Sequence, residues 1–238
     1  MTNKDPISRT KLSDKVQSRL LRVIQTQGLR PGDALPSERE LMQSYSVGRP
    51  AIREAMQNLQ RMGLVDIRHG ERPRVAAPSF DRMVEQMSET MRHLLVHSSA
   101  TMVHLKEARA TFEMEMSRIA ARNRTDADVV SLREILAEQE RARLVSADFL
   151  EADGRFHHRI AVISGNPIFA SVSLALFQWL AEFHFDLVRS PGLEQLTLAE
   201  HRQIIDAIER SDPEEAAKMT GDHLNRANSL YHQENFRR

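Results

Sequence analysis

The stretch LPSERELMQSYSVGRPAIREAMQNLQRMGLVDIRHGERPRV, residues 35–75, constrains the fold of this chain more than any other. It opens with a short predicted helix, in which Ser37 is the N-cap and Glu40, three residues later, completes a capping box. Ser46-Val47-Gly48 breaks this helix within about two turns. The pattern therefore predicts a short helix followed directly by a turn.

A second helix and a hairpin follow the turn. The helix begins near Arg49-Pro50, because proline fits the first helical turn, where its missing N–H costs nothing. Residues 65–68 then alternate as a strand does, His69-Gly70 supplies a turn, and residues 72–75 return. The helix carries one apolar stripe at helical spacing, formed by Ile52, Met56, Leu59, Met62 and Leu64.

Helix, turn, helix and wing is an arrangement that places a recognition helix in the major groove of DNA. Arg39 lies early in the first helix, and Arg49 and Arg53 lie one turn apart at the start of the second. Arginine can pair with a guanine edge or bind a phosphate, although a solvated helical surface would also explain these side chains. The wing adds Arg68, His69, Arg72 and Arg74, with Gly70 allowing close approach of the backbone.

This segment resembles the winged helix-turn-helix of GntR-type bacterial regulators. It matches the sequence pattern of that family almost position by position, in the order LPSER-L, V-R, REA, L and GL. The resemblance implies contact with operator DNA from Arg39, Arg49, Arg53, His69 and Gly70.

The length of the chain allows two domains or one large one, and its composition fits a cytoplasmic protein. The chain has 238 residues, 41% of them hydrophobic and 28% charged, with no apolar run long enough to cross a bilayer. It has no cysteine and its amino terminus is polar, so we expect neither disulfides nor a secretory signal. Residues 1–78 hold 14 Lys and Arg against 8 Asp and Glu, whereas the remainder holds 19 against 25. The basic part is therefore the part expected to meet phosphates.

The rest of the chain is predicted to be helical. Residues 12–27 form a helix capped by Ser13 that packs under the recognition helix, and residues 76–79 form a linker. We therefore expect a DNA-binding domain at residues 1–78 and an all-helical antiparallel bundle, also responsible for dimerisation, at residues 79–238. Its seven predicted helices are residues 80–95, 102–122, 126–144, 147–163, 167–188, 196–210 and 213–235. Their predicted N-caps include Thr125, Ser146 or Ala147, Asn166, and Ser211 or Asp212.

Four side chains of the bundle form a candidate metal site. Asp153 and His157 are four residues apart and share one face of a helix, and His201 and His223 lie on two later helices. One carboxylate and three imidazoles suit zinc or another divalent first-row metal. Exposed or core histidines are the plainer interpretation from spacing alone, and His158 is expected not to be a ligand.

The bundle also resembles the FCD ligand-binding domain of the FadR subfamily, which carries Asp and His in a D--FH pattern and one His on each of two later helices. The resemblance implies a metal at Asp153, His157, His201 and His223 that helps to hold a small organic acid. It also implies an effector role for Arg109, for which a salt bridge to Glu113 is the alternative. The segments GERPRVAAPS and SGNPIFASVSLALFQWL are similar to those of the N-acetylneuraminate repressors in this subfamily, which implies that sugar acid as effector.

Two other classes remain open at this point. A metal with three His and one Asp could activate water in a hydrolase, but no HExxH motif is present. Glu200 is next to His201, and we interpret it as a surface side chain. A structural DNA-binding protein with a metal-stapled bundle would need no effector. The prediction is a homodimeric repressor that binds operator DNA and responds to an organic acid.

Overall fold

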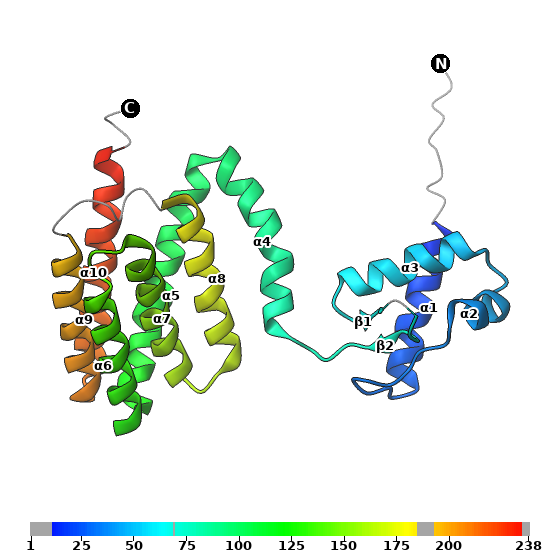
Figure 1. Cartoon of the computed structure of the whole chain (residues 1–238), viewed down its shortest axis with the longest axis horizontal. Helices are drawn as coiled ribbons and strands as arrows, with labels where there is room; N and C mark the ends of the chain where they lie inside the picture. Colours follow the sequence, from blue (N-terminus) through cyan, green and yellow to red (C-terminus); the bar gives the residue numbers. More distant parts are fainter. Residues whose placement is uncertain (1–10, 69, 185–192, 235–238) are drawn as a thin grey trace, which may run out of the picture. The chain divides into compact units, whose positions relative to one another are not determined.

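The computed structural model describes residues 11–68, 70–184 and 193–234 of the chain (Figure 1). The chain folds into two compact units, Met1–Gln86 and Met87–Arg238. The predicted domain boundary after Pro78 stays a prediction, and a new helix begins two residues later at Phe80. No helix within these ranges is long and apolar enough to cross a membrane.

The first unit contains the predicted helix-turn-helix and wing. The two strands of the wing pair antiparallel, with Val65 opposite Val75 and Asp66 opposite Arg74. The elements are α1 (Leu12–Thr26), α2 (Glu38–Tyr45), α3 (Arg49–Arg61), β1 (Val65–Asp66) and β2 (Arg74–Val75).

Local signals set the ends of these helices. The Ser37 hydroxyl accepts from the backbone N–H of Glu40 at 3.3 Å, and the Glu40 carboxylate accepts from the backbone N–H of Ser37 at 2.7 Å, so the capping box is confirmed. Ser46 adopts a left-handed conformation with φ 52° and ends α2. The predicted cap at Ser13 is wrong, because Lys11 is the N-cap of α1 and Ser13 is buried inside the first turn.

Burial of one face of α1 against α3 holds the first unit together, as the sequence predicted. Leu20, Ile52 and Leu59 are fully buried in one cluster, and Val65 and Val75 join it from the wing. Burying an aliphatic side chain of this size contributes about 1.5–3 kcal/mol. Ile52, Met56 and Leu59 of the predicted stripe therefore face the core and leave the arginines of α3 on the outside. The prediction is wrong for Met62 and Leu64, which are 48% and 36% exposed, because α3 ends at Arg61 and the helical spacing does not continue to them.

The second unit is the predicted bundle, in which α5 to α10 lie side by side with their axes roughly aligned (Figure 1). All seven predicted helices are present, although the predicted ends at residues 188 and 235 fall outside the described residues. The helices are α4 (Phe80–His97), which begins in the first unit and continues into the second, α5 (Ser99–Asn123), α6 (Asp126–Arg141), α7 (Ser146–Ile163), α8 (Pro167–His184), α9 (Leu193–Glu209) and α10 (Pro213–Glu234).

Three of the four predicted caps in the bundle are confirmed. Thr125 forms a capping box with Asp128, Asn166 accepts from the backbone N–H of Ile168 at 3.0 Å, and Asp212 accepts from the backbone N–H of Glu215 at 3.1 Å. The prediction for α7 is wrong. Its N-cap is Val145, which offers no side-chain acceptor, and Ser146 is already helical. The bundle interior is mostly aliphatic and includes Leu132, Phe156, Ile204, Ile205 and Ile208.

Candidate functional site

The arginines predicted to contact DNA lie on the exposed side of the helix-turn-helix. Arg39 is on the first turn of α2, and Arg49 and Arg53 are on the first turns of α3. Arg39 and Arg49 are exposed and make no ion pair within the described part of the chain. The Nε of Arg53 lies 3.1 Å from both carboxylate oxygens of Glu38. These side chains are available to a polyanion, and their role in DNA binding stays a prediction.

Some arginines of the wing interact with other parts of the first unit. Arg72 lies 3.2 Å from the Glu40 carboxylate, and Arg74 donates to the carbonyl oxygen of Gly32 at 2.7 Å. Arg68 is exposed and has no ion-pair partner among the described residues. Gly70 has φ +78°, a left-handed conformation that favours glycine at this turn. His69 lies outside the described residues.

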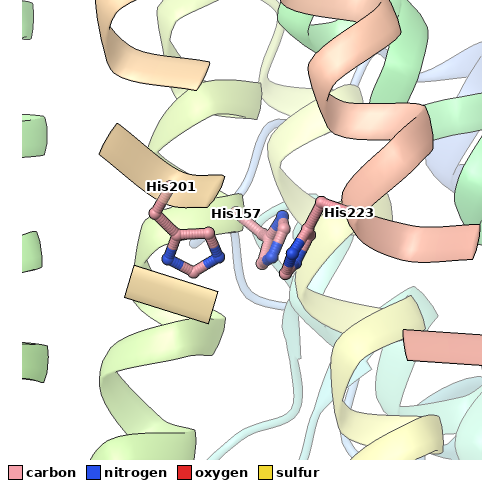
Figure 2. A group of neighbouring side chains, drawn as sticks. All are labelled: His157, His201 and His223. Atoms are coloured by element: carbon pink, nitrogen blue, oxygen red, sulfur yellow. The ribbon is translucent and has the colours of Figure 1, made fainter. Parts of the chain in front are cut away.

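Three helices of the bundle bring His157, His201 and His223 together (Figure 2). Their exposed fractions are 3%, 0% and 4%. The ring centroids are 5.3 Å apart for His157 and His201, 5.4 Å for His157 and His223, and 4.8 Å for His201 and His223. One nitrogen from each ring lies within 4.8 Å of the other two. This separation suits three ligands of a single ion.

Nδ1 of each ring lies beside an acceptor, whereas Nε2 of two of the rings has no partner. Nδ1 of His157 lies 2.5 Å from Glu113, Nδ1 of His201 lies 2.9 Å from the amide oxygen of Gln139, and Nδ1 of His223 lies 2.7 Å from Glu200. Within the described ranges, Nε2 of His157 and Nε2 of His201 are buried and have no hydrogen-bond partner. A buried polar atom without a partner is costly unless it binds something, so these nitrogens fit metal ligands.

Asp153 completes the candidate site. Its carboxylate oxygens lie 3.9 Å from Nε2 of His157 and 3.6 Å from Nε2 of His201. The four predicted ligands are therefore neighbours in space, and their role as ligands stays a prediction. His158 hydrogen-bonds to the Ala170 carbonyl at 3.1 Å, as expected for a side chain outside the cluster.

Electrostatics favour the neutral form of two imidazoles of this cluster, those of His201 and His223. Burial, reinforced by His223 and His157, holds the pKa of His201 well below its usual range. Burial also lowers the pKa of His223, against the opposing effect of its hydrogen bond to Glu200. A neutral imidazole has a lone pair free for a metal, whereas a protonated one does not.

Residues 12–75 match the gntR family of bacterial regulatory proteins, and residues 104–226 match the FCD domain. The chain is 37% identical over 235 residues to the HTH-type transcriptional repressor NanR of Enterobacter sp. (strain 638), a match covering 95% of this chain and 88% of that protein. It is 36% identical to NanR of Escherichia coli (strain K12), covering 95% of this chain and 87% of that protein. The chain belongs to the GntR family and carries an FCD domain.

Solved structures show the same fold. Streptococcus agalactiae GntR superposes with a TM-score of 0.61 at 24% identity, covering 91% of this chain and 99% of that chain. E. coli McbR/YncC superposes with a TM-score of 0.53 at 16% identity, covering 94% and 99%. The relatives are transcriptional regulators, so this GntR-family chain is a DNA-binding regulator and not the hydrolase that a metal site alone would have allowed.

Arg109 makes the salt bridge that we considered as its alternative role. Its Nε donates to Glu113 at 2.5 Å, and the two side chains are 13% and 5% exposed. Its guanidinium also lies 5.8 Å from the ring centroid of Phe177. A role of Arg109 in binding the effector stays a prediction.

Sequence reasoning missed the partners of the histidines. The interpretation of Glu200 as a surface side chain is wrong, because it is 16% exposed and contacts both His223 and Arg226. Gln139 and Glu113 were not assigned to the site, although both contact a histidine. The spacing of Arg109 and Glu113 was a usable signal, but nothing near Gln139 in the sequence points to His201.

Proposed function

We propose that this GntR-family regulator is a homodimeric, cytoplasmic repressor whose operator binding is controlled by a sugar acid at a metal site in the FCD domain. The observation that carries the proposal is the buried histidine cluster, in which two unpartnered Nε2 atoms and the Asp153 carboxylate lie around one point. The identity of 36–37% to NanR repressors over 95% of the chain supports the repressor assignment.

The proposed ion is a divalent metal, most simply zinc, held by Asp153, His157, His201 and His223. The donor set fits, because imidazole nitrogen and carboxylate oxygen are ordinary zinc ligands and no thiolate is available in this cysteine-free chain. A bound ion would offer coordination positions to the carboxylate or hydroxyl oxygens of an organic acid. The protein supplies three buried imidazoles, and it lowers the pKa of two of them, those of His201 and His223, which favours the neutral form that such an ion requires.

The proposed effector is N-acetylneuraminate, as the similarity of two segments to the N-acetylneuraminate repressors implies. Two copies of the chain would present two α3 helices to two operator half-sites. Effector binding would change how the two DNA-binding units are spaced or how freely they move. By linkage, an effector that lowers operator affinity must itself bind less tightly to the DNA-bound protein.

Operator binding is tested with Arg49→Ala, measured by fluorescence anisotropy on labelled duplex DNA that the wild-type protein is first shown to bind specifically. Loss of a bidentate base contact should cost about 1–3 kcal/mol of binding free energy. Arg22→Ala, an exposed arginine on α1, is the matched control. Equal binding by the two variants would remove Arg49 from the DNA-binding set.

The sensor is tested by calorimetric titration of metal-loaded protein with N-acetylneuraminate, repeated after removal of the metal. We expect heat of binding only with metal, and none in His201→Ala. Binding that is unchanged after the metal is removed would refute the metal-dependent mechanism. Absence of heat in both states would refute N-acetylneuraminate as the effector and leave the DNA-binding assignment intact.

A further inference from the structure

Three side chains outside the predicted ligand set contact the three rings of the histidine cluster, one side chain to each ring. Glu113 of α5 contacts His157, Gln139 of α6 contacts His201, and Glu200 of α9 contacts His223. We propose that Glu113, Gln139 and Glu200 are positioning residues that fix which nitrogen each histidine offers to the ion. This inference rests on the metal site proposed above.

The chemical argument begins with the tautomer. A neutral imidazole has one N–H and one lone pair, and an acceptor beside Nδ1 places the proton on that nitrogen. The lone pair then lies on Nε2. Nδ1 of His201 and Nδ1 of His223 hydrogen-bond to their acceptors at 2.9 Å and 2.7 Å, and the Glu113 carboxylate lies 2.5 Å from Nδ1 of His157. This arrangement assigns Nε2 of the three histidines as the metal-facing atoms. The buried, unpartnered Nε2 atoms of two of these rings agree with that assignment.

Gln139 contacts two of the predicted metal ligands, His201 and Asp153. It is fully buried, its amide oxygen accepts from His201 at 2.9 Å, and its amide nitrogen donates to Asp153 at 3.0 Å. Only a side chain with both an acceptor and a donor can satisfy the two ligands at once. A carboxylate at this position would repel Asp153, and an aliphatic side chain would leave two buried polar groups without partners. Gln139 therefore sets the relative placement of Asp153 and His201.

Each of the two glutamates also accepts a hydrogen bond from an arginine. Arg109 donates to Glu113 at 2.5 Å, and Arg226 donates to Glu200 at 2.6 Å. Each carboxylate therefore lies between a guanidinium and an imidazole, and an anionic acceptor makes the imidazole a stronger metal ligand.

A purely structural role would also explain these contacts, since ion pairs between helices can hold a bundle together. The two roles differ in what a conservative substitution changes. Glu→Gln keeps the side-chain volume and an acceptor oxygen but removes the charge and weakens the ion pair with the arginine, so a purely structural role predicts lower stability with unchanged metal affinity of the folded protein. A positioning role predicts lower metal affinity, because partners of this kind typically contribute about 10–100-fold to affinity.

The test uses the full-length protein with Co²⁺ as a spectroscopic probe and Zn²⁺ as a competitor. Affinity is measured by chelator competition, and the ligand field by visible absorption of the Co²⁺ protein. We expect Glu113→Gln and Glu200→Gln to weaken metal binding by about 10-fold, and Gln139→Leu by about 100-fold with a changed Co²⁺ spectrum. Glu140→Gln, which alters an exposed ion pair with Arg202, is the matched control and should change neither readout.

The outcomes separate the two proposals. Wild-type affinity and an unchanged Co²⁺ spectrum in all three variants would overturn the positioning role while the metal site remains. Failure of the wild-type protein to bind either metal would overturn the metal site and the positioning role together. If Gln139→Leu does not fold by circular dichroism, the two Glu→Gln variants decide the question alone.

Discussion

The packing of Gly154 beside a predicted metal ligand allows a stability prediction with a stated size. A Cβ added at Gly154 of α7 would lie 2.4 Å, 2.6 Å and 2.7 Å from three ring carbons of Phe177 in α8. Non-bonded carbons prefer separations of about 3.5–4.0 Å, so the ring would have to move by about 1 Å. Phe177 is restricted in doing so, because it is half-buried in the bundle and the Arg109 guanidinium lies 5.8 Å from its centroid.

Gly221 of α10 provides the matched comparison. A Cβ there would lie 3.0 Å from Sδ and 3.2 Å from Cε of Met114, the flexible end of a side chain that can rotate away. Both substitutions replace a helical glycine by alanine and gain about 1 kcal/mol of helix propensity. The propensity gain cancels between them, so the difference reports overpacking, which costs about 1–3 kcal/mol. We expect Gly154→Ala to be less stable than Gly221→Ala by that amount.

The assay is urea unfolding followed by the fluorescence of Trp179, the single tryptophan, which is 8% exposed on α8. Because Trp179 belongs to the second unit, the signal reports that unit alone. Equal midpoints and slopes for the two variants would refute the reasoning. They would show that α8 can move away from α7 without cost.

Three further predictions concern the capping boxes, the first core and the metal. Asp128→Asn should lower the free energy of unfolding by about 1 kcal/mol at pH 7, measured by urea unfolding. Thr125 and Arg159 outweigh burial and lower the pKa of Asp128, so this contribution to stability should disappear as the pH falls below about 4. A difference between the two proteins that does not change with pH would contradict this. Ile52→Ala, at a fully buried position, should cost about 2–5 kcal/mol and abolish operator binding by unfolding the first unit, while chelator competition still detects the metal site. Metal removal should lower the melting temperature of the second unit, because an ion present at about 1,000 times its Kd adds about 4 kcal/mol to the free energy of unfolding. An unchanged melting curve would contradict the proposed site.

Local chemistry made much of the fold predictable from the sequence. The Ser37 and Glu40 capping box, and the one formed by Thr125 and Asp128, depend on residues three positions apart, so their geometry follows once a helix forms. Asp153 and His157 are close for the same reason, because a helix places such residues on one face. The predicted caps at Ser13 and Ser146 missed the observed N-caps, Lys11 and Val145, by two residues and by one, because neither helix start has a side-chain cap hydrogen bond that would fix it locally.

The partners of the histidines were not predictable in this way. Gln139 and His201 are 62 positions apart in the chain, and Glu200 and His223 are 23 apart. Their contacts depend on which faces of α6, α9 and α10 meet in the bundle, and periodicity gives each helix an apolar face without specifying its neighbour. The polarity of Glu200 suggested a surface position, whereas its pairing with His223 and Arg226 allows it to be largely buried.

The ion pair between Arg53 and Glu38 raises the question of whether Arg53 is available to DNA. The two side chains are 59% and 37% exposed, and an exposed ion pair contributes about 0–1 kcal/mol. A bidentate contact of arginine with guanine discriminates by about 1–3 kcal/mol, so giving up Glu38 costs less than the contact provides. Arg74 differs, because it links the wing to the loop between α1 and α2 by donating to the Gly32 carbonyl, and its release would leave that backbone acceptor without this partner. Base recognition by α3 is therefore compatible with the ion pair, whereas Arg74 is better suited to holding the wing in place.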